Sequence, residues 1–189
     1  NKFWNPNIYN KMLSISVCPY CNSQFTFTQQ IVGIENRKFK IRPDLDHFFV
    51  KSEHPMLAIS LYNLVPSCNI CNSKLKGNID GIVGTTIHPF LDEFDQIAYF
   101  KRDVTDDFHN TDFYSQIMGI NDEYKLTLVP IDIKDTERVK LYETTYQLTK
   151  RYEAYKTIVN KSIKKSLLYS HNYLKSLNSS YDFKDFKKS

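Results

Sequence analysis

The four cysteines are the residues whose spacing most directly predicts chemistry. They form two CxxC pairs, Cys18 with Cys21 and Cys68 with Cys71, and 46 residues separate the pairs. A CxxC loop lets two thiolates converge on one ion, so two loops complete a tetrahedral four-cysteine site that is closed to substrate. The pattern predicts one structural zinc ion, and an iron–sulfur cluster or two redox pairs fit it less well. We expect no secretory signal and hence a cytoplasmic protein, which also favours metal ligands over disulfides.

A second group of polar residues lies between and just after the cysteine pairs. His47 carries an imidazole, which titrates near neutrality and can take a proton from water. The carboxylate of Asp46 and the side-chain carbonyl of Asn72 are oxygen ligands of the kind that a hard divalent cation needs. Lys74 and Lys76 follow Asn72 and could contact phosphates. Each of these residues alone is more often a cap, core or surface residue.

The segment from about residue 17 to residue 77 resembles the HNH endonuclease family, the ββα-metal nucleases that carry a zinc-knuckle scaffold. The resemblance rests on Asp46-His47, Asn63 and Asn72, which occur in the family's order together with the two CxxC pairs. It implies a two-stranded hairpin with a long loop, followed by one helix that begins at the second cysteine pair. Many members have His at the last motif position, and Asn72 there favours Mg²⁺ over transition metals.

The resemblance also implies a role for each motif residue. His47 would be the general base, and Asp46 with Asn72 would hold one catalytic Mg²⁺, with Mn²⁺ as the alternative ion. Asn63 would fix the loop whose backbone orients His47. The implied activity is that of a metal-dependent endonuclease that hydrolyses DNA phosphodiester bonds.

Further stretches are similar to the HNH component of Septu-type anti-phage systems. They are the CPYC opening at residues 18–21, the NLVPSC run at 63–68 and the HPFLD run at 88–92. This similarity implies a role in antiviral defence and a partner ATPase of the ABC or SMC-like kind. The partner would dock on the C-terminal part of the chain.

The predicted fold class is α+β, with a zinc-stabilised HNH core in residues 1–79 and a mainly helical extension in residues 80–189. The extension divides by charge, because residues 80–136 carry a net −8 and residues 137–189 a net +7. The first of these parts is expected to be an acidic linker region of irregular structure. No stretch of about eighteen apolar residues is present, so no membrane partner is expected.

Hydrophobic periodicity predicts several elements within this plan. Apolar residues recur at helical spacing from Thr136 to about Leu177, which predicts one long helix or two consecutive ones. Strands are expected at Asp46–Val50 and Tyr124–Val129, and a helix at Asn69–Lys76 that stops at Gly77.

A competing function is a catalytically silent zinc-knuckle module that binds nucleic acid or a protein. The basic segments and the cysteine pairs fit this function as well as they fit a nuclease. The joint presence of Asp46, His47 and Asn72 favours the nuclease, since a binding module does not need all three.

Overall fold

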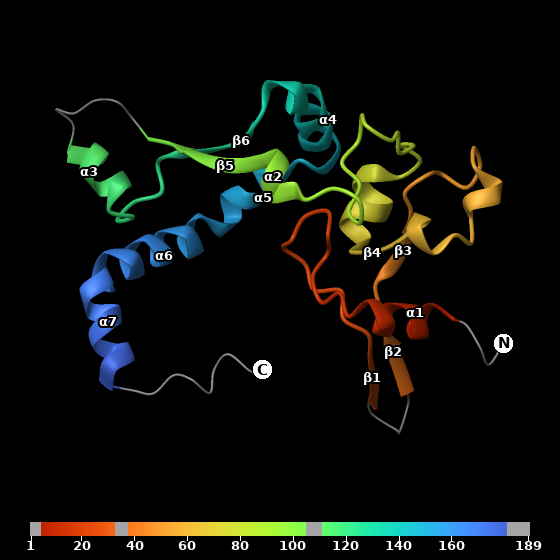
Figure 1. Ribbon diagram of the computed structural model, residues 1–189, viewed down its shortest axis with the longest axis horizontal. Coiled ribbons are helices and arrows are strands. Elements are labelled where there is room, and N and C mark those ends of the chain that lie inside the picture. The colour runs from red at the N-terminus through yellow and green to blue at the C-terminus, as the bar shows by residue number, and fades with distance from the viewer. Residues whose placement is uncertain (1–4, 33–37, 105–110, 181–189) are drawn as a thin grey trace. The chain divides into compact units, whose positions relative to one another are not determined.

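The structure is a computed structural model that describes residues 5–32, 38–104 and 111–180 (Figure 1). It combines short helices with small two-stranded sheets, as the α+β prediction expected. The chain forms two compact units, one of residues 1–99 and 128–148 and the other of residues 100–127 and 149–189. The sequence predicted a boundary between an HNH core and a helical extension at residues 79 and 80, and this boundary stays a prediction. The two compact units divide the chain at residues 99, 127 and 148 instead.

The first unit is built around an antiparallel hairpin of β3 (Asp44–His47) and β4 (Leu64–Ser67). Asp46 pairs with Val65 and His47 with Leu64, and all four residues of β4 are buried. Because side chains alternate along a strand, Asp46 points into the unit and His47 is only half-buried.

Strand β3 lies earlier in the chain than the predicted Asp46–Val50. The Phe48 N–H still donates to the Asn63 carbonyl at 3.0 Å, but the next two backbone amides bind side chains. The N–H of Phe49 donates to Asn63 Oδ1 at 2.7 Å, and the N–H of Val50 donates to Asp80 Oδ1 at 2.7 Å. The chain therefore leaves the ladder of the hairpin after Phe48.

The predicted helix after the second cysteine pair is present as the π-helix η4 (Ile70–Lys76). It ends at Gly77, whose φ of 51° is a backbone conformation that glycine adopts at little cost. The first unit contains further short elements. They are α1 (Pro6–Leu13), β1 (Gln29–Val32) paired with β2 (Lys38–Ile41), the 3₁₀ turns η2 (Pro55–Leu57), η3 (Leu61–Asn63) and η5 (Ile133–Asp135), α2 (Phe94–Ile97) and α4 (Thr136–Tyr146).

Helix α4 joins the cysteine-bearing part of the chain through tyrosines. The ring of Tyr146 stacks on Tyr20 with centroids 4.8 Å apart, and Tyr142 donates from its hydroxyl to the Tyr20 carbonyl at 2.6 Å. Val139, Tyr142 and Tyr146 are all buried on α4. The face of α4 that carries these apolar residues is therefore core in this unit.

The HPFLD run at residues 88–92 forms a turn that is tied to α4. The backbone N–H of His88 donates to Asp92 Oδ2 at 2.7 Å, and Arg138 on α4 pairs with Asp92 at 2.8 Å and with Asp135 at 2.9 Å. The imidazole of His88 packs 4.2 Å from the ring of Phe48. This run therefore stabilises the residue that follows His47.

The second unit has a small aromatic core. Phe100 stacks on Tyr152 at 4.6 Å, and the cations of Arg102 and Lys156 each lie 5.1 Å from the centre of the Tyr124 ring. The elements that contribute residues to this unit are β5 (Ala98–Asp103), α3 (Thr111–Ile117), β6 (Lys125–Pro130), α5 (Leu148–Tyr152), η6 (Glu153–Tyr155), α6 (Lys156–Leu168) and α7 (His171–Ser180). Sheet β5–β6 contains the predicted strand at Tyr124–Val129.

Two expectations for the C-terminal part were wrong. The predicted one or two long helices are four shorter ones, since Gln147 takes a left-handed φ of 51° and η6 separates α5 from α6. The region expected to be irregular contains α2, α3 and β5 as well as the predicted strand. Among the residues that the structure describes, no helix is long and apolar enough to cross a membrane.

Removing one hydroxyl tests the contact between α4 and the first cysteine loop. We expect Tyr142→Phe to lower the free energy of unfolding by about 1–2 kcal/mol, because the buried Tyr20 carbonyl loses its donor while the ring is kept. Urea denaturation measures the change, and Tyr62→Phe on an exposed side chain is the matched control. Equal stability of the two variants would contradict this contact.

The buried His88 makes stability depend on pH. Burial lowers the pKa of His88, and its Nδ1 accepts the N–H of Phe90 at 3.1 Å, so the fold holds the neutral ring. Below about pH 6.5 the unfolded chain then binds more protons than the folded one. The free energy of unfolding therefore decreases as the pH is lowered, by up to about 1.4 kcal/mol per pH unit. We expect urea unfolding between pH 7.5 and 5.5 to show a shallower decline in His88→Gln than in the natural chain. The same slope in both would exclude this role.

Candidate functional site

The four cysteines converge as their spacing predicted. All four Sγ atoms lie within 4.8 Å of one another, and Cys21 Sγ is 3.9 Å from Cys68 Sγ. A tetrahedral zinc with Zn–S bonds of about 2.3 Å places its sulfurs about 3.8 Å apart, so the cluster fits such an ion. Cys18, Cys21 and Cys71 are buried and Cys68 is partly exposed. The cluster could hold a metal ion such as zinc.

Local hydrogen bonds shape both cysteine loops. The first loop closes through the N–H of Asn22, which donates to the Cys18 carbonyl at 2.7 Å, and Ser23 donates to Cys21 Sγ at 3.3 Å. In the second loop the N–H of Cys71 donates to Cys68 Sγ at 3.4 Å. Donors aimed at sulfur are what a bound thiolate needs.

The thiols strongly perturb one another's ionisation. Hydrogen bonds from the neighbouring thiols, Cys18 first, lower the pKa of Cys68 to about 6, and Cys18 likewise lowers that of Cys21. The same contacts raise the pKa of Cys18 and Cys71, since each further thiolate would face an existing one. Four thiolates in this space therefore require a cation, which is the chemistry of a metal site.

Asp46 lies buried between the two cysteine loops, and its side chain is only 3% exposed. Tyr20, which lies between Cys18 and Cys21, donates its hydroxyl to Asp46 Oδ2 at 2.5 Å. Lys76 at the end of η4 donates to Asp46 Oδ1 at 3.1 Å and to the His47 carbonyl at 2.8 Å. Both carboxylate oxygens are thus engaged, and a divalent cation does not fit on Asp46 as the side chains stand.

The placement of Lys76 corrects one expectation. It was predicted to contact phosphates at the surface, but its side chain is 4% exposed. The physical reason is the buried charge of Asp46, which is costly without an opposite charge beside it. Lys74 on the same helix is exposed and stays a predicted phosphate contact.

His47 is oriented by the loop between β3 and β4. Its Nε2 lies 3.0 Å from the carbonyl of Ala58, so Nε2 carries the proton in the neutral ring and Nδ1 is the acceptor. Asn63 clamps the same loop from inside. Its Nδ2 donates to the carbonyls of Phe49 at 3.1 Å and Leu57 at 3.0 Å, while its Oδ1 accepts from the Phe49 N–H.

Asn72 stands directly after Cys71 on η4, and β3 packs against this helix. The backbone N–H of Asn72 donates to the Cys68 carbonyl at 3.0 Å, and its side chain is half-buried. The structure therefore brings Asp46, His47 and Asn63 into one hairpin, with Asn72 on the helix that packs beside it.

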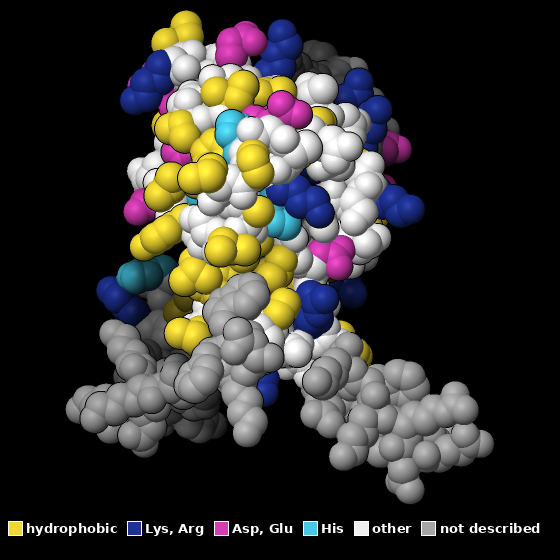
Figure 2. Space-filling model, turned by 90° about the vertical axis from the view of Figure 1, so that its right-hand side faces the viewer, with side chains coloured by type: hydrophobic (Ala, Val, Ile, Leu, Met, Phe, Trp, Pro, Cys, Tyr) yellow, Lys and Arg dark blue, Asp and Glu magenta, His cyan; other side chains and the backbone are white. Residues whose placement is uncertain are grey.

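The loop that holds His47 has an apolar surface. It exposes 90% of Met56, 82% of Ile59 and 73% of Tyr62. Figure 2 shows hydrophobic side chains gathered on this face of the molecule. Basic side chains for phosphate contact would come from η4, where Lys74 is exposed.

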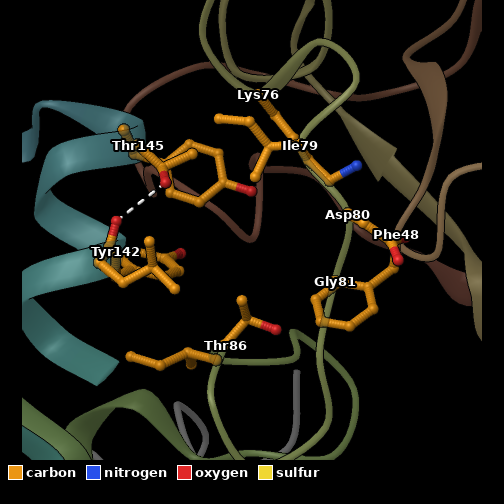
Figure 3. Close-up of a pocket in the computed structure, with 11 residues that line it drawn as sticks. Phe48, Lys76, Ile79, Asp80, Gly81, Thr86, Tyr142 and Thr145 are labelled. Atoms are coloured by element: carbon orange, nitrogen blue, oxygen red, sulfur yellow. Dashed lines mark hydrogen bonds between the residues drawn. The ribbon is translucent and has the colours of Figure 1, made fainter. Parts of the chain in front are cut away.

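The first unit also contains a pocket (Figure 3). Its lining includes Phe48, Lys76, Asp80, Tyr142 and Tyr146. Asp80 also pairs with His54 Nε2 at 2.8 Å. Although burial raises its pKa, the hydrogen bonds from Val50 N–H and His54 and the nearby charge of Lys76 hold the pKa of Asp80 below its ordinary value.

Sequence reasoning missed the roles of Tyr20, Lys76 and Asp80. The one signal for Tyr20 was its place inside the first CxxC loop, which guarantees that it lies near the metal cluster. Nothing in the local pattern distinguishes Lys76 from Lys74, since both read as exposed helix positions.

Metal analysis tests the cysteine cluster. We expect about one zinc ion per purified chain, and none in Cys68→Ser, which should also unfold at lower temperature because binding and folding are linked. Asn69→Ser is the matched control, since Asn69 lies in the same loop and is not a ligand. Mass-spectrometric metal content after gel filtration and thermal unfolding are the measurements. A folded, equally stable protein without metal would contradict a structural ion.

Comparisons with known proteins give one partial similarity. No protein family matches the chain, and no solved structure matches it. Among curated proteins, a segment of 52 residues is 36% identical to Protein ea31 of Escherichia phage lambda. The similarity covers 26% of this chain and 18% of that protein, so the chain spans less than a fifth of that relative's length.

Proposed function

We propose that the protein is a metal-dependent endonuclease of the HNH type that hydrolyses DNA phosphodiester bonds. The observation that carries the proposal is the clamp on the His47 loop. Asn63 makes three hydrogen bonds to Phe49 and Leu57, and Ala58 in the same loop accepts from His47. A core histidine or a turn asparagine does not need this arrangement, whereas a general base must be held in one orientation.

His47 is the proposed general base. Its Nε2–H is held by the Ala58 carbonyl, so Nδ1 is the atom that takes a proton from the attacking water. The half-buried position leaves the ring accessible from solvent. Lys74, which lies on η4 two residues after Asn72 and is exposed, is the proposed phosphate contact.

The divalent cation belongs to the proposal through Asp46 and Asn72, whose oxygens suit Mg²⁺, with Mn²⁺ as the alternative. When bound, such an ion supplies Lewis-acid stabilisation of the phosphate and the leaving oxygen. Asp46 does not fit the ion while Lys76 and Tyr20 occupy both of its oxygens.

The proposed setting is a cytoplasmic anti-phage system in which the nuclease works with an ABC or SMC-like ATPase. This part rests on the resemblance of the CPYC, NLVPSC and HPFLD runs to Septu-type components. The closed state of Asp46 favours a second candidate, a zinc-stabilised module that binds nucleic acid or protein without cutting.

A plasmid-nicking assay on the zinc-loaded protein separates the two. We expect nicking that requires added Mg²⁺, falls at least about a hundredfold in His47→Ala and is retained in His171→Ala, whose ring is exposed on α7. Asn63→Asp should also lose activity, since it keeps the acceptor for Phe49 N–H but removes both donors.

Nicking that persists in His47→Ala would overturn the assignment of the base. Binding of the plasmid without nicking, in a zinc-loaded protein and in the presence of an ABC or SMC-like ATPase partner, would favour the binding module instead.

A further inference from the structure

One face of α6 carries a row of lysines that no other described residue neutralises. Lys161, Lys164 and Lys165 are three and four positions apart, so they share one face of the helix, and all three are exposed. No carboxylate in the described part of the chain pairs with any of them. Like charges at this spacing destabilise a helix, and residues 154–180 contain no Asp or Glu to offset them. The row therefore favours a negatively charged occupant.

The opposite face of α6 is packed within the second unit. Asn160 is buried, and its Nδ2 donates to the Asn121 carbonyl at 2.8 Å. The backbone of Gly119 approaches the helix closely, because a Cβ there would lie 3.0 Å from the Asn160 carbonyl oxygen and 3.3 Å from Ile163 Cβ. These contacts fix which side of α6 packs inward, and the lysine row lies on the other side.

Two tyrosines follow the lysine row where α6 passes into α7 (Figure 1). The N–H of Tyr169 donates to the Lys165 carbonyl at 2.8 Å, and Tyr173 lies in the first turn of α7. Their rings stack with centroids 5.6 Å and planes 13° apart, and the residues are 47% and 44% exposed. Leu168, 74% exposed, adds apolar surface next to Tyr169 in the chain. Proteins that bind single-stranded nucleic acid combine such rings with lysines, since bases stack on the rings and phosphates contact the ammonium groups.

We propose that the lysine row and the tyrosine pair together bind single-stranded DNA. This α6–α7 surface consists of Lys161, Lys164, Lys165, Tyr169 and Tyr173. The lysines contact phosphates, and the exposed side of the tyrosine stack takes an unpaired base. A duplex gains the phosphate contacts alone, because its bases are already stacked on one another. The inference goes beyond the proposed function, since the surface lies in the second unit, and only the choice of DNA over RNA rests on that function.

An acidic protein surface is the competing occupant, because it would also neutralise the lysine row. It gives no reason for two nearly parallel, half-exposed rings directly after the lysines. A nucleotide accounts for both features, since it joins a negative phosphate to a flat base that stacks on an aromatic ring.

Fluorescence anisotropy with a labelled single strand of about 20 nucleotides tests the lysine row on the zinc-loaded full chain. We expect Lys161→Gln with Lys165→Gln to weaken binding at least about fivefold. The slope of log affinity against log salt should become shallower by about 1.4, because each phosphate contact on a single strand contributes about 0.7. Lys125→Gln with Lys175→Gln is the matched control, since it removes two exposed charges from the same unit, and should leave affinity and slope nearly unchanged.

A second double variant tests the rings. Tyr169→Leu with Tyr173→Leu keeps apolar side chains but removes the flat faces, so binding of the single strand should weaken at least about fivefold. Binding of a duplex of the same sequence should be equal in this variant and the natural chain. Tyr114→Leu, on a residue of the same unit that is 62% exposed, is the control and should bind the single strand as the natural chain does.

The outcomes separate this inference from the proposed function, because binding is measured without Mg²⁺ and needs no cutting. The proposal would be overturned by equal affinity of the natural chain and the lysine variant, by no binding at about 50 mM salt, or by a duplex bound as tightly as the single strand. A poly-glutamate peptide bound as tightly as the oligonucleotide would assign the surface to an acidic protein instead. Tighter binding of an RNA strand would overturn the choice of DNA. Binding as expected with no nicking of plasmid would overturn the proposed function alone.

Discussion

The buried negative charge of Asp46 is the constraint on which the rest of the first unit depends. A carboxylate removed from water costs several kcal/mol unless an opposite charge and hydrogen bonds compensate it. Here the compensation comes from Tyr20 in the first cysteine loop and Lys76 beyond the second. The hairpin that carries Asp46 is therefore stable only when both loops are in place around it. The Tyr20 hydroxyl and η4 with its Lys76 thus connect the cysteine cluster to Asp46.

The thiol cluster and helix α4 also hold the two cysteine loops in place. Four sulfurs within 4.8 Å of one another need a cation to ionise together, so a metal ion bound there would fix how the two loops approach. Helix α4 then closes the unit by stacking Tyr146 on Tyr20 and binding the Tyr20 carbonyl. Tyr20, which orients Asp46, is thus fixed by the first cysteine loop, by the ring of Tyr146 and by the hydroxyl of Tyr142. The proposed nuclease chemistry uses a hairpin that the clamp within its own loop and long-range contacts from Tyr20 and Lys76 support together.

The sequence predicted the local features of this arrangement better than the long-range ones. The convergence of the cysteines, the helix that stops at Gly77 and the strand near Tyr124 follow from spacing, turn residues and alternation, which are local signals. The burial of Lys76 depends on where Asp46 lies 30 residues earlier, and no periodicity encodes that. Gln147 breaks the C-terminal helix in a left-handed conformation that glycine or asparagine usually signals. The clamp by Asn63 was expected from the family resemblance alone, and its three hydrogen bonds are what the residue pattern could not supply.

A crystal structure of the zinc-loaded protein grown with Mn²⁺ tests the account most directly, because anomalous scattering distinguishes the two metals. The account predicts zinc at the four cysteines and manganese bound by Asp46 and Asn72. It would be contradicted by a structure saturated with Mn²⁺ in which Lys76 still binds Asp46 and no manganese lies beside that carboxylate.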